Sequence, residues 1–150
     1  MPNPLKFLVP FDFSRHSLET LRFALSLREY HPASFVLLHV VASGEVESFA
    51  NLGDAPGETL ARRIDEARAE LEQQLERSRA DFPGSDLSCR VVSGVPFKEI
   101  CRLADEENFQ LIVIGTHGRT GLSHLLIGST AERVVQHASC PVLNVKPQVL

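Results

Sequence analysis

The segment from Gly115 to Thr130 is the part of the sequence best suited to hold a phosphate group. Its glycines are Gly115, Gly118, Gly121 and Gly128. Backbone N–H groups at a helix N-terminus and the positive end of the helix dipole attract anions, and glycines let the main chain approach them closely. Ser129 and Thr130 add hydroxyls where a helix is expected to begin. The alternative is a long glycine-containing turn with an ordinary serine cap, and the glycines alone leave both interpretations open.

Other phosphate-binding and nucleophile motifs are absent from the sequence. There is no G-x-x-x-x-G-K-[ST] loop and no G-x-G-x-x-G after the first expected strand. Ser123 is central in Gly121–Leu125, but Leu125 stands where a nucleophile elbow requires glycine. The chain also lacks a Walker B pair and an arginine-finger context, which efficient phosphoryl transfer needs. We therefore expect no catalytic residues.

The histidines indicate neither a metal site nor a catalytic base. The six histidines contain no H-E-x-x-H motif and no tight ligand cluster. His39 lies in an apolar run and is interpreted as a hydrogen-bonded core residue. His117 has no nucleophile partner in the sequence that would make it a catalytic base. Arg119, in the glycine segment, either meets a phosphate or is solvated.

Short apolar runs alternate with longer segments of helical period along the chain. Continuous runs such as Leu111–Ile114 indicate strands buried on both faces of a parallel sheet. The five expected strands are Leu5–Pro10, Ser34–Val41, Leu87–Ser93, Leu111–Ile114 and Pro141–Lys146. The four expected helices run from the cap Ser14 past Leu25, from about Glu58 to Asp81, from Pro96 to about Asn108, and from near Ser129 to near Ala138. This alternation predicts an α/β fold with an open, doubly wound sheet, in which Ala42–Gly57 is a long surface loop.

Composition places the chain among ordinary globular proteins and excludes several partners. Its 150 residues predict one domain, residues 1–150. A net charge of −4 supplies no basic face for nucleic acid, and no apolar stretch approaches the length of a membrane span. The odd number of cysteines, three, gives no disulfide framework. These features predict a cytoplasmic protein.

The spacing Gly115-x2-Gly118-x9-Gly128-Ser129 resembles the nucleotide-loop signature G-2x-G-9x-G-[ST] of the ATP-binding universal stress proteins. Weaker similarities to the same family occur in order along nearly the whole chain. They are Pro10-Phe11-Asp12-Phe13-Ser14, similar to the family's P-x-D-x-S segment; Leu37-Leu38-His39-Val40; Gly94-Val95-Pro96; and Cys140-Pro141-Val142-Leu143-Asn144-Val145. The resemblance gives no guidance for Ser43–Gly57.

The resemblance implies a Rossmann-like, five-stranded parallel sheet of order 3-2-1-4-5 with helices on both faces. The order reverses between strands one and four, so their carboxyl ends frame a crevice. It further implies that Asp12 holds the ribose hydroxyls and that the main chain at Val40 reads the adenine edge. The other implied cofactor-binding residues are Pro10, Gly115, His117, Gly118, Arg119, Gly128, Ser129 and Thr130. The alternative role for Asp12 is that of an acid at a helix N-terminus beside Ser14.

The function implied is that of an ATP-binding regulatory protein involved in stress response. Mg²⁺ can arrive on the nucleotide, since it needs few protein ligands there. Two alternatives remain open, namely a slow ATPase or phosphotransfer enzyme using the same crevice, and a dimeric scaffold without ligand. The resemblance also implies a homodimer through the last strand.

That last strand is expected at the sheet edge, where unpaired N–H and C=O groups invite a partner. Val142, Leu143 and Val145 would leave apolar surface beside this edge, and Lys146 is its only charge. A second copy can pair with it about a two-fold axis. The alternative is a monomer whose tail, Pro147–Leu150, folds over the edge.

Overall fold

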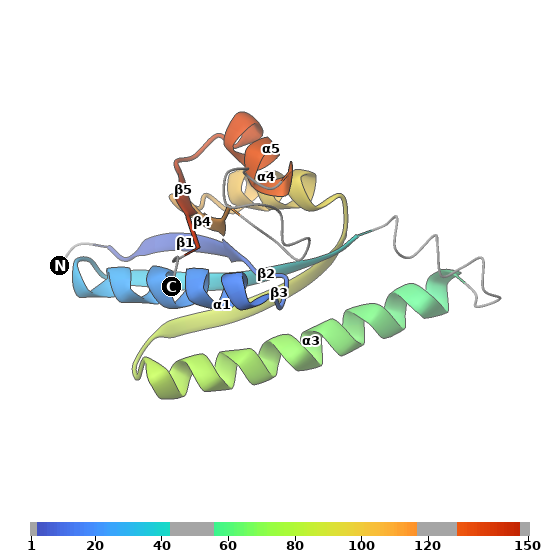
Figure 1. Ribbon diagram of the computed structural model, residues 1–150, viewed down its shortest axis with the longest axis horizontal. Helices are drawn as coiled ribbons and strands as arrows, with labels where there is room; N and C mark the ends of the chain where they lie inside the picture. The colour runs from blue at the N-terminus through green and yellow to red at the C-terminus, as the bar shows by residue number, and fades with distance from the viewer. Residues whose placement is uncertain (1–2, 43–55, 117–128, 148–150) are drawn as a thin grey trace.

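Five parallel strands form one sheet in the computed structural model, which describes residues 3–42, 56–116 and 129–147. Across the sheet their order is β3-β2-β1-β4-β5, which confirms the predicted fold class and strand order. The strands, shown in Figure 1, are β1 (Leu5–Pro10), β2 (Ala33–Ala42), β3 (Asp86–Gly94), β4 (Leu111–Gly115) and β5 (Val142–Val145). Chain order reverses between β1 and β4, so β2 and β3 lie on one side of β1 while β4 and β5 lie on the other.

The helices connect these strands at the places that the sequence predicted. They are α1 (Arg15–Ser26), the short 3₁₀ helix η1 (Leu27–Glu29), α3 (Pro56–Asp81), α4 (Pro96–Glu106) and α5 (Ser129–His137). The turn η1 has no counterpart among the predicted elements. Helix α4 ends at Glu106 rather than at the predicted Asn108, because Asn108 has a left-handed φ of 56° that cannot continue a helix. Most of the predicted loop Ala42–Gly57 lies outside the described residues.

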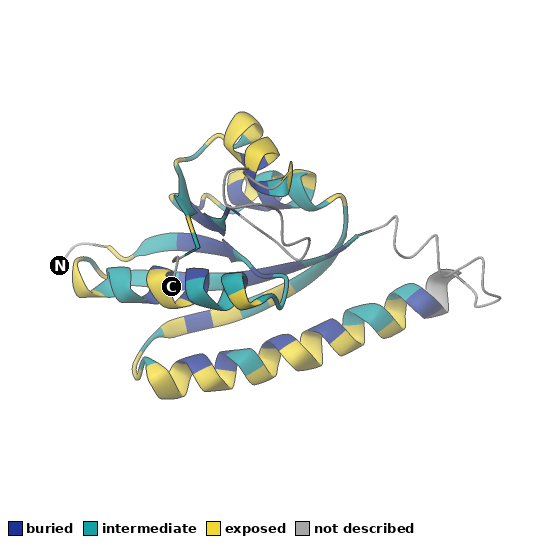
Figure 2. Ribbon diagram, in the orientation of Figure 1, coloured by how far each residue is buried: buried dark blue, intermediate teal, exposed yellow. Residues whose placement is uncertain are grey.

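Each face of the sheet is covered by a pair of helices with its own hydrophobic cluster. Along β1, Phe7 and Val9 enter the cluster on the α1 and α3 face, while Leu8 enters the cluster on the α4 and α5 face. The central strands are therefore buried on both sides, as their continuous apolar runs predicted. Figure 2 shows this burial in the strands and on the sheet-facing sides of the helices.

Helix α3 has 26 residues and is anchored by two different clusters. Toward its C-terminus, Leu71 and Leu75 pack in the large cluster on the α1 face. Nearer its N-terminus, Ala67 packs with Val41 in a small separate cluster, whose partly buried members are Phe13, Leu60, Ile64 and Val91. The apolar residues Leu60, Ile64, Ala67, Leu71 and Leu75, spaced three or four apart, thus face the sheet. None of the helices within the described ranges is long and apolar enough to cross a membrane.

Candidate functional site

The carboxyl ends of β1 and β4 lie side by side at one edge of the sheet. The two strands pair in parallel, with Leu8 opposite Ile112. Strand β1 ends at Pro10 and β4 ends at Gly115. The chain continues from β1 into α1 on one face of the sheet, and α5, the next described helix after β4, lies on the other face. This edge is therefore the switch point at which open α/β sheets bind ligands.

Asp12 is fixed at this edge by the first turn of α1. Its Oδ1 accepts hydrogen bonds from the Ser14 N–H at 3.0 Å and from the Ser17 hydroxyl at 2.5 Å. The Asp12 N–H in turn donates to Ser17 Oγ at 3.1 Å, and the Ser17 N–H donates to Ser14 Oγ at 3.1 Å. The carboxylate therefore has the role of an acid at a helix N-terminus. A carboxylate offers about four acceptor positions, so this role leaves ribose binding as a prediction rather than replacing it.

Phe13 gives the turn its shape, because its φ of 66° is in the left-handed region. A bulky residue adopts this conformation only when its surroundings hold it there. The Phe13 ring packs 5.3 Å from the Phe11 ring and 4.7 Å from the His39 ring, centroid to centroid. His39 is buried, and its Nδ1 lies 2.8 Å from the Phe11 carbonyl oxygen. The interpretation of His39 as a hydrogen-bonded core histidine is thus confirmed.

Strand β2 extends past the end of β1 at the same edge. The last β1 residue, Pro10, pairs with Leu38, and the Phe11 N–H donates to the Leu38 carbonyl oxygen at 2.8 Å. Beyond that point β2 continues alongside β3, where Val40 pairs with Val92. The main chain at Val40 therefore lies at the carboxyl edge of the sheet, past the last residue of β1 that pairs with β2.

Gly115 is closely covered by α1. A Cβ at this position would lie 2.6 Å from His16 Cδ2, 2.7 Å from His16 Nε2 and 2.9 Å from Thr20 Oγ1. Contacts below 3 Å are not tolerated without movement, so only glycine fits. This is a packing reason for Gly115 that is separate from any contact with a phosphate.

His16 and Thr116 connect this region to the last strand, and neither residue is predicted from the sequence to belong to the site. The Val145 carbonyl oxygen accepts from the Thr116 N–H at 3.0 Å and lies 2.9 Å from His16 Nε2. Since a carbonyl oxygen only accepts, Nε2 carries the proton. For His16 the sequence signal available was its i, i+4 spacing from Thr20, which places both polar side chains on one face of α1.

The residues predicted to bind phosphate are only partly described. Ser129 and Thr130 are the first two residues of α5, at the end of the helix that favours anions. Ala131, next in the chain, belongs to the same buried cluster as Ile114 at the end of β4. His117, Gly118, Arg119 and Gly128 lie outside the described residues. Of the predicted set, the structure thus brings together Pro10, Asp12, Val40 and Gly115 at the carboxyl edge.

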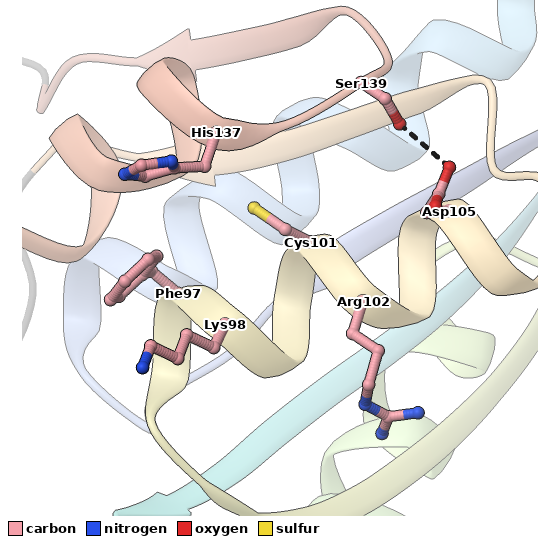
Figure 3. A pocket seen from close by; sticks show the side chains of 7 residues that line it. All are labelled: Phe97, Lys98, Cys101, Arg102, Asp105, His137 and Ser139. Atoms are coloured by element: carbon pink, nitrogen blue, oxygen red, sulfur yellow. Dashed lines mark hydrogen bonds between the residues drawn. The ribbon is translucent and has the colours of Figure 1, made fainter.

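A hollow of about 360 Å³ lies between α4 and the end of α5 (Figure 3). It is lined by Phe97, Lys98, Cys101, Arg102, Asp105, His137 and Ser139. Its polar groups largely pair among themselves or with nearby side chains. The Ser139 hydroxyl donates to Asp105 Oδ1 at 3.1 Å, and the Arg102 guanidinium bonds Glu99 and Glu106. We therefore regard the carboxyl edge as the better candidate site.

The cysteines do not supply a reactive centre. Burial raises the pKa of the Cys101 and Cys140 thiols, so both are protonated at neutral pH and are weak nucleophiles. Within the ranges that the structure covers, no group of three His, Cys, Asp or Glu side chains is placed to hold a metal ion.

Comparison with known proteins gives matches over nearly the whole chain, in both sequence and fold. Residues 5–146 match the model of the universal stress protein family. A universal stress protein of Methanocaldococcus jannaschii is 33% identical over 142 residues, covering 94% of this chain and 81% of the relative. The solved structure of MJ0577, also from M. jannaschii, has a TM-score of 0.83 at 29% identity and covers 97% of this chain and 98% of its own.

Some structures of this fold were solved with a nucleotide bound, and one of them contains AMP. It is a universal stress protein family protein from Arabidopsis thaliana with AMP bound. Its TM-score is 0.65 at 20% identity, with 97% of this chain and 94% of that chain covered. At this identity the likeness shows the fold.

The close cover of Gly115 predicts the effect of adding a single methyl group there. Gly115→Ala should lower the free energy of unfolding by about 1–3 kcal/mol, the range for overpacked sites, as measured by urea denaturation. The double variant with His16→Ala should lose less than the sum of the two single variants, because removing the imidazole makes room for the new methyl. Strictly additive losses would show that His16 is not what the methyl group meets.

Proposed function

Because the chain belongs to the universal stress protein family, we propose that it is a regulatory protein that binds ATP at the carboxyl ends of β1 and β4. The observation that carries this proposal is the Asp12 carboxylate, fixed just after β1 at the switch point of the sheet. Sites of this kind bind nucleotides because one strand end offers polar side chains and the other offers a close main-chain approach.

The proposed roles follow from the chemistry of the groups at the edge. Asp12 accepts hydrogen bonds from the ribose hydroxyls, which is a contact that suits a carboxylate held at the start of α1 by Ser14 and Ser17. The main chain at Val40, past the end of β1, reads the edge of the adenine ring. Pro10 lies between these two contacts as the last residue of β1.

The phosphates are proposed to lie between Gly115 and the first turn of α5. Ser129 and Thr130 provide hydroxyls and backbone N–H groups at that helix end. His117, Gly118, Arg119 and Gly128 complete the proposed set, and a Mg²⁺ ion would be carried by the nucleotide. The AMP bound to the Arabidopsis relative supports an adenine nucleotide as the ligand.

We also propose that the protein is cytoplasmic and has one domain. Two copies of it are proposed to form a homodimer through β5. Strand β5 lies at the end of the sheet order, with β4 as its neighbour. All four residues of β5 are only half-buried, because β5 has a neighbouring strand on one side and none on the other within the described sheet. A second copy would cover the other side and pair its main-chain groups.

Nucleotide binding is tested by calorimetry on protein stripped of ligand. We expect ATP to bind in the micromolar range, about −8 kcal/mol. Asp12→Ala should weaken binding about tenfold or more, because hydrogen bonds to a charged group contribute about 1.5–3 kcal/mol. Ser14→Ala is the matched control, since it removes the cap of α1 but no proposed ribose contact.

Gly118→Val should weaken ATP further, since its side chain would intrude on the phosphates. No heat at millimolar ATP with Mg²⁺ would reject the function proposed. Wild-type affinity in both Asp12→Ala and Gly118→Val would instead reject the assignment of the site.

Hydrolysis, where it occurs, should be far slower than the roughly 1–100 s⁻¹ of dedicated kinases, because the sequence lacks the groups that phosphoryl transfer requires. A phosphate-release assay under saturating ATP measures it. Several turnovers per second, lost in a Gly118→Val variant, would place the protein among enzymes.

The oligomeric state is measured by light scattering after size exclusion at micromolar concentration. We expect twice the 16.6 kDa mass of one chain. Val142→Pro and Val145→Asp should both lower the mass, because one removes a donor from the strand and the other puts a charge beside it. A wild-type mass near 16.6 kDa would instead support the monomer.

A further inference from the structure

The main-chain groups of β5 alternate between facing β4 and facing away from it. The Ile112 N–H donates to the Pro141 carbonyl oxygen, and the Thr116 N–H donates to that of Val145, both at 3.0 Å. In a parallel ladder the N–H and C=O of one residue point to the same neighbour, and the next residue points to the other side. Three residues therefore direct both groups away from β4: Val142, Asn144 and, one residue past the strand, Lys146.

This pattern restricts how a second copy can pair with the edge. In an antiparallel pair about a two-fold axis, each outward-facing residue must lie opposite another outward-facing residue. The two-fold axis must then pass at a residue that lies opposite its own copy, and it cannot pass midway between two consecutive residues. A register centred on Asn144 pairs all three outward residues, with Asn144 opposite itself and Val142 opposite Lys146. Registers centred on Leu143 or Val145 pair only two of them.

The Asn144 side chain independently favours the same centre. It is the one polar side chain within β5, Val142–Val145. Its Oδ1 is buried within the chain and has no hydrogen-bond partner among the residues that the structure describes. Leaving a buried polar atom unsatisfied costs about 1–3 kcal/mol, so a rotamer that turns the amide to a partner at the open edge is favoured.

A primary amide is its own complement, because it carries both an acceptor and donors. Residues directly opposite in an antiparallel pair have Cβ atoms about 4.5–5.5 Å apart, within reach for two amides. Rotation about χ2 of asparagine, a broad torsion, can turn the oxygen toward the axis. Two copies of Asn144 can therefore satisfy each other only if the axis passes beside that residue.

We propose that two copies of this chain join through β5 in an antiparallel register centred on Asn144, whose amides pair across the two-fold axis. The inference rests on the proposed homodimer and adds its register and its polar contact. On the sheet face that carries α4 and α5, Asn144 follows Val142, which packs in the cluster of that face. Leu143 and Val145 pack on the opposite face and remain clear of the amide pair.

Pairwise cysteine crosslinking measures the register directly. The background is the full chain with Cys89, Cys101 and Cys140, which are free thiols, replaced by serine. Residues opposite each other have Cα atoms about 5.5 Å apart, within the range of a disulfide. Under diamide, Asn144→Cys should crosslink to itself, and Val142→Cys mixed with Lys146→Cys should form a crosslinked pair.

Val142→Cys alone is the matched control. In the proposed register its two copies are displaced by four residues along the strand, roughly 13 Å, and should not crosslink. A crosslink between Val142→Cys and Asn144→Cys would place the axis at Leu143, and one between Asn144→Cys and Lys146→Cys would place it at Val145. Either result overturns the proposal.

A charge exchange tests the amide contact without a disulfide. Asn144→Asp and Asn144→Lys should each weaken dimerisation at least tenfold by light scattering, and an equimolar mixture should restore it. Unchanged dimers in both variants would overturn the proposal, as would a failure of the mixture to recover while circular dichroism shows both folded. A monomeric wild-type chain would reject the proposed homodimer itself, whereas a dimer without any of these crosslinks would reject only its β5 register.

Discussion

The carbonyl oxygen of Val145 joins three elements that are far apart in the sequence. It receives the Thr116 N–H from the end of β4 and the His16 imidazole from α1, and it belongs to the last residue of β5. The same imidazole lies over Gly115 and leaves no room for a Cβ. The position of α1, the start of the segment after β4 and the end of the edge strand are thus fixed together.

Several residues at the carboxyl edge have a structural role even without a ligand. Asp12 holds the first turn of α1, Gly115 makes room for His16, and Ser129 begins α5. The motif that resembles a nucleotide loop is therefore also part of what packs the helices onto the sheet. A chain that lost its ligand would still be under constraint at Asp12 and Gly115, because both residues help to hold α1 on the sheet.

The sequence predicted the strands because their signal is local. Runs such as Leu111–Ile114 are continuous only when a strand is buried on both faces, and β4 begins at Leu111 as expected. The end of α4 was missed because it depends on the left-handed conformation of Asn108, which residue type only permits. His16 and Thr116 were missed because their partner, Val145, is 129 and 29 positions away. The strand order and the site followed from the family resemblance, not from local patterns.

The two-part anchoring of α3 means that this helix need not open as one unit. Its C-terminal half is held by the main cluster through Leu71 and Leu75, whereas its N-terminal half relies on a small group around Val41 and Ala67. Regions with few buried apolar contacts open locally at a lower free energy than the global unfolding reaction. Phe13, the strained residue of the β1 turn, packs against that small group as well as against the main cluster. Local opening of the N-terminal half of α3 would therefore remove part of the packing around Phe13. A ligand that orders the β1 turn would slow amide exchange more than forty residues further along the chain, in a helix that it does not touch.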